Sequence, residues 1–115
     1  MLIDVRVDGK NVGAVERLDA VREDRDKASG RCSRVRIDAD KADDFFVFGH
    51  SNPSFQTVPF SIVITEATEE GTRITEFSEL RITKRCTRHA TEDFVIIEPL
   101  EWEGVRAEGR RNDQT

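Results

Sequence analysis

The sequence predicts a mainly β, strand-rich domain that assembles with copies of itself. Two segments near the C-terminus, residues 73–87 and 92–104, have the composition of adjacent long strands joined by a polar turn. Both exceed the usual strand length of about five or six residues, which favours a sheet that continues beyond one small domain. Only 37% of the 115 residues are hydrophobic and 36% are charged, so a thin core would gain stability from subunit contacts. The alternative is an ordinary small β domain with a well-solvated surface.

The chain opens with a half-buried strand. Apolar and polar residues alternate over residues 2–8, which is the period expected when one face of a strand is buried. Gly9 then supplies a turn residue that tolerates positive φ. Residues 12–15 start either a partner strand or a helix, because apolar residues also recur at every third position up to Val21. The hairpin is the favoured interpretation.

A charged stretch follows over residues 22–30 and ends in turn residues. One interpretation is a solvated loop. The other is an exposed arm with charges of both signs, suited to contact a neighbouring subunit. The candidate inter-subunit residues are Arg22, Glu23, Asp24, Arg25, Asp26 and Lys27.

The middle of the chain predicts two further strands. Alternation returns over residues 31–40, and residues 40–44 would cap a short helix. This helix leads into the aromatic cluster at residues 45–48, which is interpreted as a plug of the core rather than a ligand site. A strand over residues 58–66 then precedes a hairpin turn at residues 68–71.

The long C-terminal strands each contain one irregularity. In the first, alternation slips either between Ile74 and Phe77 or between Phe77 and Leu80, as a β-bulge would cause. The second has four consecutive apolar residues at 94–97, which predicts cover on both faces. Pro99 then marks a bulge, a kink or an edge, since proline cannot donate to a ladder.

The bulk properties limit the classes of function. We expect one domain over residues 1–104 and a C-terminal tail over residues 105–115, free or ordered by a partner. The net charge of −5 and pI of about 5.1 argue against a general nucleic-acid binder, which needs a basic face. There is no apolar run of the roughly 20 residues that a membrane span needs. The N-terminus has no signal-peptide pattern, which predicts folding in a cytoplasm.

No arrangement of residues predicts catalysis or metal binding. Cys86 and His89 have Cys-x-x-His spacing, but Cys32 and His50 do not form a comparable second pair of zinc ligands. Carboxylates are distributed along strands and turns, and there is no phosphate-binding loop or nucleophile elbow. We therefore expect no metal, no cofactor and no catalytic residue, so that the protein is not an enzyme.

The two cysteines have two possible states. In a cytoplasm, Cys32 and Cys86 would be free thiols. Outside the cell they would meet oxidising conditions, and a disulfide within or between subunits would form if their Cα atoms lay within about 7 Å.

Two local patterns support a more specific assignment. Residues 77–105 contain Leu80-Arg81-Ile82-Thr83, a polar turn, and then Asp93-Phe94-Val95-Ile96-Ile97-Glu98 and Leu100-Glu101-Trp102. The chain also opens with Ile3-Asp4-Val5-Arg6-Val7-Asp8-Gly9. In these patterns and in its order of elements, the chain resembles the tail-tube proteins of contractile phages and the related tubes of type VI secretion and other contractile injection systems.

The resemblance implies two packed antiparallel sheets, a β-sandwich or barrel-like fold, with one short flanking helix. Six copies would form a ring in which the sheets continue between subunits. The rings would stack into a tail tube, a structural part of the virion tail that is assembled in the host cytoplasm.

The resemblance also implies the partners of such a tube. They are further copies of the chain, the tail sheath, baseplate proteins, and DNA that passes through without specific binding. An acidic lining would keep phosphates from adhering. The candidate lumen carboxylates are Glu66, Glu69, Glu76, Glu79, Glu98 and Glu101.

Two other assignments compete with a tail tube. One is a baseplate or terminator ring component, or a secretion-system tube subunit, of the same fold. The other, from a different class, is a monomeric β-sandwich binding module that uses the aromatic residues at 45–48 and Phe55.

Overall fold

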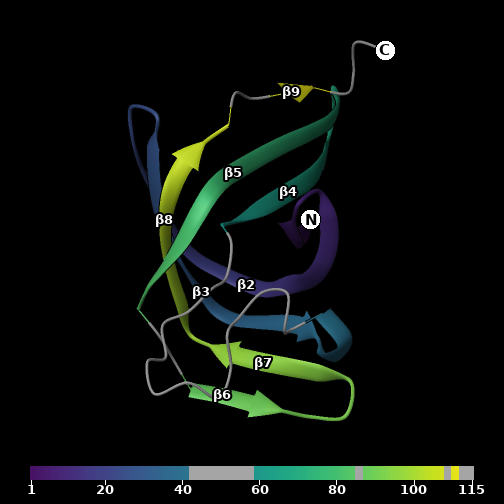
Figure 1. Cartoon of the computed structure of the whole chain (residues 1–115). Coiled ribbons are helices and arrows are strands. Elements are labelled where there is room, and N and C mark those ends of the chain that lie inside the picture. The colour runs from purple at the N-terminus through teal and green to yellow at the C-terminus, as the bar shows by residue number, and fades with distance from the viewer. Residues whose placement is uncertain (42–58, 85–86, 108–109, 112–115) are drawn as a thin grey trace.

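The computed structural model describes residues 1–41, 59–84, 87–107 and 110–111. The predicted mainly β class is confirmed. The strands are β1 (Leu2–Val7), β2 (Lys10–Asp24), β3 (Lys27–Asp38), β4 (Phe60–Thr68), β5 (Gly71–Lys84), β6 (Thr87–Ala90), β7 (Phe94–Glu98), β8 (Leu100–Arg106) and β9 (Arg110–Arg111), and one 3-10 turn, η1 (Ala39–Lys41), follows β3 (Figure 1).

Six strands close into an antiparallel barrel. Their order is β1-β2-β3-β8-β5-β4, and β4 pairs with β1 to complete the ring. Strand β7 pairs with the end of β3 that β8 does not cover, and β6 pairs with the other side of β7. The prediction of a barrel-like fold therefore holds as one sheet closed on itself, with β6 and β7 as an extension below the barrel in Figure 1.

The barrel interior is filled by inward-facing apolar side chains around Trp102. Its indole is 1% exposed, and its ring centroid lies 5.3 Å from that of Phe77. The indole lies directly over Gly30, its partner across the β3–β8 ladder, where a Cβ atom would come within 2.3 Å of the ring. The Trp102 ring on β8 therefore fits only because position 30 on β3 is a glycine.

The two long strands near the C-terminus are paired on both sides within the chain. Strand β5 lies between β4 and β8, and β8 lies between β5 and β3 (Figure 1). The expectation that these strands find their partners on another copy is therefore wrong, because barrel closure satisfies them internally. Among the described residues, β2 beyond Ala14 pairs only with β3, and β6 pairs only with β7.

The two predicted irregularities are both present. Ile62 pairs with Phe77 and Phe60 pairs with Leu80, so Ser61 faces two residues on β5. The β-bulge therefore lies at the second of the two expected positions, and Glu79 within it takes a φ of 55°. At Pro99 the second long segment divides into β7 and β8, which both pair with β3.

The charged stretch at residues 22–30 is not a loop. It forms the end of a hairpin between the 15-residue β2 and the 12-residue β3, with Arg25 in the turn at a φ of 62°. The hairpin predicted after Gly9 is confirmed, and the helix alternative is wrong. Residues 22–30 form strands and not a loop because the Ala28 side chain is buried and its backbone pairs with β8.

Three other expectations have different outcomes. The first turn of the expected short helix is η1, whereas residues 42–58, including the aromatic cluster, Phe55 and His50, lie outside the described residues. The predicted strand over residues 73–87 ends at Lys84. At the C-terminus, β8 continues through Arg106, beyond the expected domain boundary at residue 104, because β3 and β5 both pair with it there.

Candidate functional site

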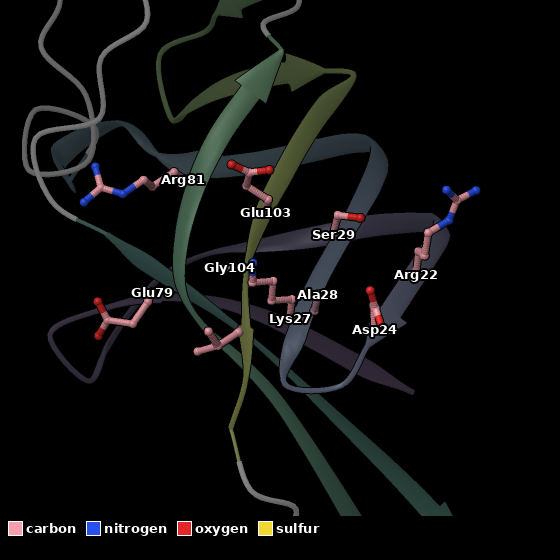
Figure 2. A pocket seen from close by; sticks show the side chains of 10 residues that line it. Arg22, Asp24, Lys27, Ala28, Ser29, Glu79, Arg81, Glu103 and Gly104 are labelled. Atoms are coloured by element: carbon pink, nitrogen blue, oxygen red, sulfur yellow. The ribbon is translucent and has the colours of Figure 1, made fainter.

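A groove of about 420 Å³ lies beside the β2–β3 hairpin. One side is the hairpin face, defined as Arg22, Asp24 and Lys27. The other side is the β5–β8 wall, defined as Glu79, Arg81 and Glu103. Figure 2 shows Ser29 and Glu103 between Arg22 at one end and Arg81 at the other.

The strand register produces this groove. Arg22 pairs with Ser29, Ser29 with Glu103, and Glu103 with Arg81, which forms one row across four strands. Alternation of side chains along each strand places such directly paired residues on one face of the sheet. The small residues Ala28 and Gly104 also pair directly and line the groove. Because residues alternate along each strand, the side-chain positions of Ala28 and Gly104 face the barrel interior, opposite to those of Ser29 and Glu103.

Gly104 also allows β5 to approach closely at its bulge. A Cβ atom at Gly104 would come within 2.5 Å of the Leu80 side chain and 2.6 Å of the Ser78 carbonyl oxygen. Glu79, the other residue of the bulge, also lines the groove. The bulge therefore contributes an acidic group that regular alternation would have placed elsewhere.

The residues of the predicted inter-subunit segment, 22–27, have different surroundings in the hairpin. The Glu23 carboxylate forms an ion pair with the Arg106 guanidinium at 2.9 Å. The Arg106 backbone N–H donates a hydrogen bond to the Asp26 carbonyl oxygen at 2.8 Å. These contacts attach the hairpin end to the end of β8. Arg25 lies exposed in the turn. The remaining three residues of the segment form the hairpin face.

All six charged residues of the groove are exposed. Three are basic and three are acidic, and no side-chain ion pair or hydrogen bond joins any of them to another residue within the described ranges. Two opposite pairs, Asp24 with Lys27 and Arg81 with Glu103, are nevertheless direct neighbours across strands. The groove can therefore offer charges of both signs to a partner without first breaking internal pairs.

The structure does not bring the six candidate lumen carboxylates together. Glu66 and Glu98 are on β4 and β7, Glu69 is in the β4–β5 turn, Glu76 and Glu79 are on β5, and Glu101 is on β8. Glu69 and Glu79 are exposed and the other four are half-buried. Only Glu79 lines the groove.

Cys32 is a free thiol that faces the barrel interior and is 0% exposed. Of the two states considered for the cysteines, the structure has Cys32 as a free thiol, and Cys86 lies outside the described residues. Burial raises the pKa of the Cys32 thiol to about 12; the neighbouring Trp102 side chain opposes this shift and the Asp19 charge adds to it. A protonated, enclosed thiol has neither the access nor the thiolate character that disulfide exchange requires.

Within the described ranges, no group of three or more His, Cys, Asp and Glu side chains is arranged to hold a metal ion. The helical content of those ranges also includes no segment long and apolar enough to cross a membrane.

Sequence reasoning found the hairpin face but not the wall opposite it. Arg81 and Glu103 lie on the two strands expected to be adjacent, so their opposite charges were a usable signal. Their pairing depends on a register with shifts near residue 79 and after Ile82, and that register cannot be counted from the sequence.

Comparison with protein-family models, curated proteins and solved structures finds no significant match to this chain. The functional assignment therefore depends on the residues of the chain itself.

Proposed function

We propose that this chain is a structural subunit of a tail tube of the contractile-phage type, which forms six-membered rings that stack around a channel for genome delivery. The proposal begins from the resemblance of residues 77–105 and of the first strand and turn to such tubes. The observation that carries it further is the hairpin face, which is exposed and has charges of both signs that form no ion pair within the described ranges.

The fold changes how such a ring would be built. Because β5 and β8 are paired on both sides within the chain, they cannot supply the subunit contact through their edges. The contacts would instead use the hairpin, the open side of β2 and the edge of β6. Each of these has backbone or charged groups without a partner among the described residues.

The proposed partners follow from this role. Further copies of the chain would form the rings and their stacks, and tail sheath and baseplate proteins would surround and end the tube in the virion. DNA would pass through without specific binding, which agrees with the net charge of −5. No catalytic step or cofactor is part of the proposal. A baseplate or terminator ring, or a secretion-system tube, would use the same surfaces.

A monomeric binding module is the second candidate. The observation that favours it is barrel closure, because a domain with both long strands satisfied internally does not need a second copy to fold. In that case the groove would hold a ligand of another kind.

Light scattering after size-exclusion chromatography, with negative-stain microscopy of the same fractions, separates the two. A tube subunit gives rings or stacked rings at multiples of 13.1 kDa. A protein that stays at the monomer mass at every concentration and forms no rings would overturn the tube proposal and support the binding module.

A further inference from the structure

We propose that the groove is a contact between copies of this chain, in which the hairpin face of one copy lies against the β5–β8 wall of another. This inference rests on the proposed self-assembly and identifies the two surfaces that meet. The argument comes from which charges the fold pairs and which it leaves unpaired.

Nearer the base of the same hairpin, exposed charges are paired within the chain. Glu16 binds Arg34 at 2.8 Å, and Asp19 contacts Arg17 at 3.2 Å and Arg31 at 3.7 Å. At the hairpin end, Glu23 pairs with Arg106 at 2.9 Å, whereas the residues of the hairpin face have no such pairs among the described residues. Within the described ranges, the hairpin face therefore differs both from the hairpin base and from Glu23 in that its charges are unpaired.

The two sides of the groove have opposite charge patterns. The hairpin face carries two positive charges and one negative, in the order positive, negative, positive. The β5–β8 wall carries two negative charges and one positive, in the order negative, positive, negative. The two surfaces therefore carry opposite net charges, one positive and one negative, which favours their contact.

These two surfaces lie side by side on one copy, as the row from Arg22 to Arg81 in Figure 2 shows. Within the described ranges of one copy, no ion pair joins a residue of one surface to a residue of the other. They can meet when a second copy places its hairpin face on this wall. The second copy is the favoured occupant because it carries the matching pattern, whereas a nucleic acid would be repelled by the two glutamates of the wall.

A charge-swap experiment on the full chain tests this contact. One variant reverses the hairpin face (Arg22→Glu with Lys27→Glu), and a second reverses the wall (Glu79→Lys with Glu103→Lys). Matched controls carry the same charge change outside the groove, as Lys10→Glu with Arg73→Glu and as Glu69→Lys with Glu70→Lys. Self-association is measured by sedimentation velocity at low ionic strength, where charge contacts are least screened, and circular dichroism checks that each variant folds.

We expect each groove variant to associate at least about tenfold more weakly than the native chain, because like charges then face each other. A one-to-one mixture of the two variants should recover association to within about threefold, since the reversed hairpin face meets the reversed wall. Both controls should behave as the native chain does.

Two results would overturn the inference while leaving the proposed function intact: native rings that persist in both groove variants, or groove variants that dissociate but do not recover on mixing. A native chain that is monomeric at every concentration would overturn both this inference and the proposed function.

Discussion

Strands β3 and β8 present two faces with opposite properties. On the inner face, Gly30, Cys32 and Trp102 are enclosed by the barrel, and Cys32 and Trp102 are at most 1% exposed. On the outer face, Lys27 and Glu103 are exposed and unpaired among the described residues. The same backbone ladder thus holds a tightly packed core on one side and a solvated charged surface on the other. Stability should depend on the first face and self-assembly on the second.

The largest effect is expected for Trp102→Ala. Removing an indole that is 1% exposed and packed on Phe77 should lower the free energy of unfolding by about 3–5 kcal/mol, which is large beside the roughly 5–15 kcal/mol of a typical domain. Urea unfolding followed by circular dichroism measures the change. Trp102→Phe, which keeps an aromatic ring at the site, should lose clearly less, and equal losses in the two variants would show that Trp102 is not the centre of the core.

The next effect concerns the residue beneath that ring. Gly30→Ala places a Cβ atom within 2.3 Å of the indole and 2.9 Å of the Ala20 carbonyl oxygen. We expect a loss of about 1–3 kcal/mol from overpacking. Because Trp102 is the only tryptophan, its fluorescence reports the unfolding and any shift of the ring. Ser29→Ala, one residue along on the outer face, is the matched control and should change stability by less than about 0.5 kcal/mol.

These two faces also show what the sequence could predict. Alternation over residues 2–8, the slip before Leu80 and the break at Pro99 are local signals, and the structure has all three features. The sequence gives no strand signal at the hairpin end, because β2 is exposed on both faces from Ala20 onward and no apolar period marks it. Strand pairing between segments that are distant in sequence is the other feature that the sequence does not show. Nothing in β5 or β8 alone shows that the barrel closes between them, and the groove depends on that closure.

A third prediction uses the pH dependence of stability. The Cys32 thiol is neutral when protonated, and its pKa of about 12 in the folded protein lies above the ordinary value of 9.0. The folded state therefore holds this proton more tightly than the unfolded state. The resulting stability is fully present below pH 9.0 and is lost as the pH rises toward 12.

The free energy of unfolding, measured by urea titration in steps above pH 9.0, should fall by at most about 1.4 kcal/mol per pH unit from this group. The experiment uses a Cys86→Ser background, so that Cys32 is the only thiol. Adding Cys32→Ala should remove this part of the alkaline loss. An identical pH profile in the two proteins would show that Cys32 is not buried as described.

The smallest effects separate paired from unpaired charges on the outer face. Asp19 accepts a hydrogen bond from the Ser33 hydroxyl at 3.0 Å and contacts Arg17 and Arg31, and its side chain is 23% exposed. Asp19→Ala should therefore lower the free energy of unfolding by about 1 kcal/mol. Asp24→Ala removes a carboxylate with no side-chain partner in the described ranges and should stay within about 0.5 kcal/mol.

Self-association should show the reverse order for the same two variants. Asp19→Ala should associate as the native chain does, because its pairs are internal. Asp24→Ala alters the positive, negative, positive pattern of the hairpin face and should change the association constant, although by less than the double reversals do. Equal stability losses in the two variants would mean that Asp24 contributes to the fold as Asp19 does, and the distinction between paired and unpaired charges would then fail.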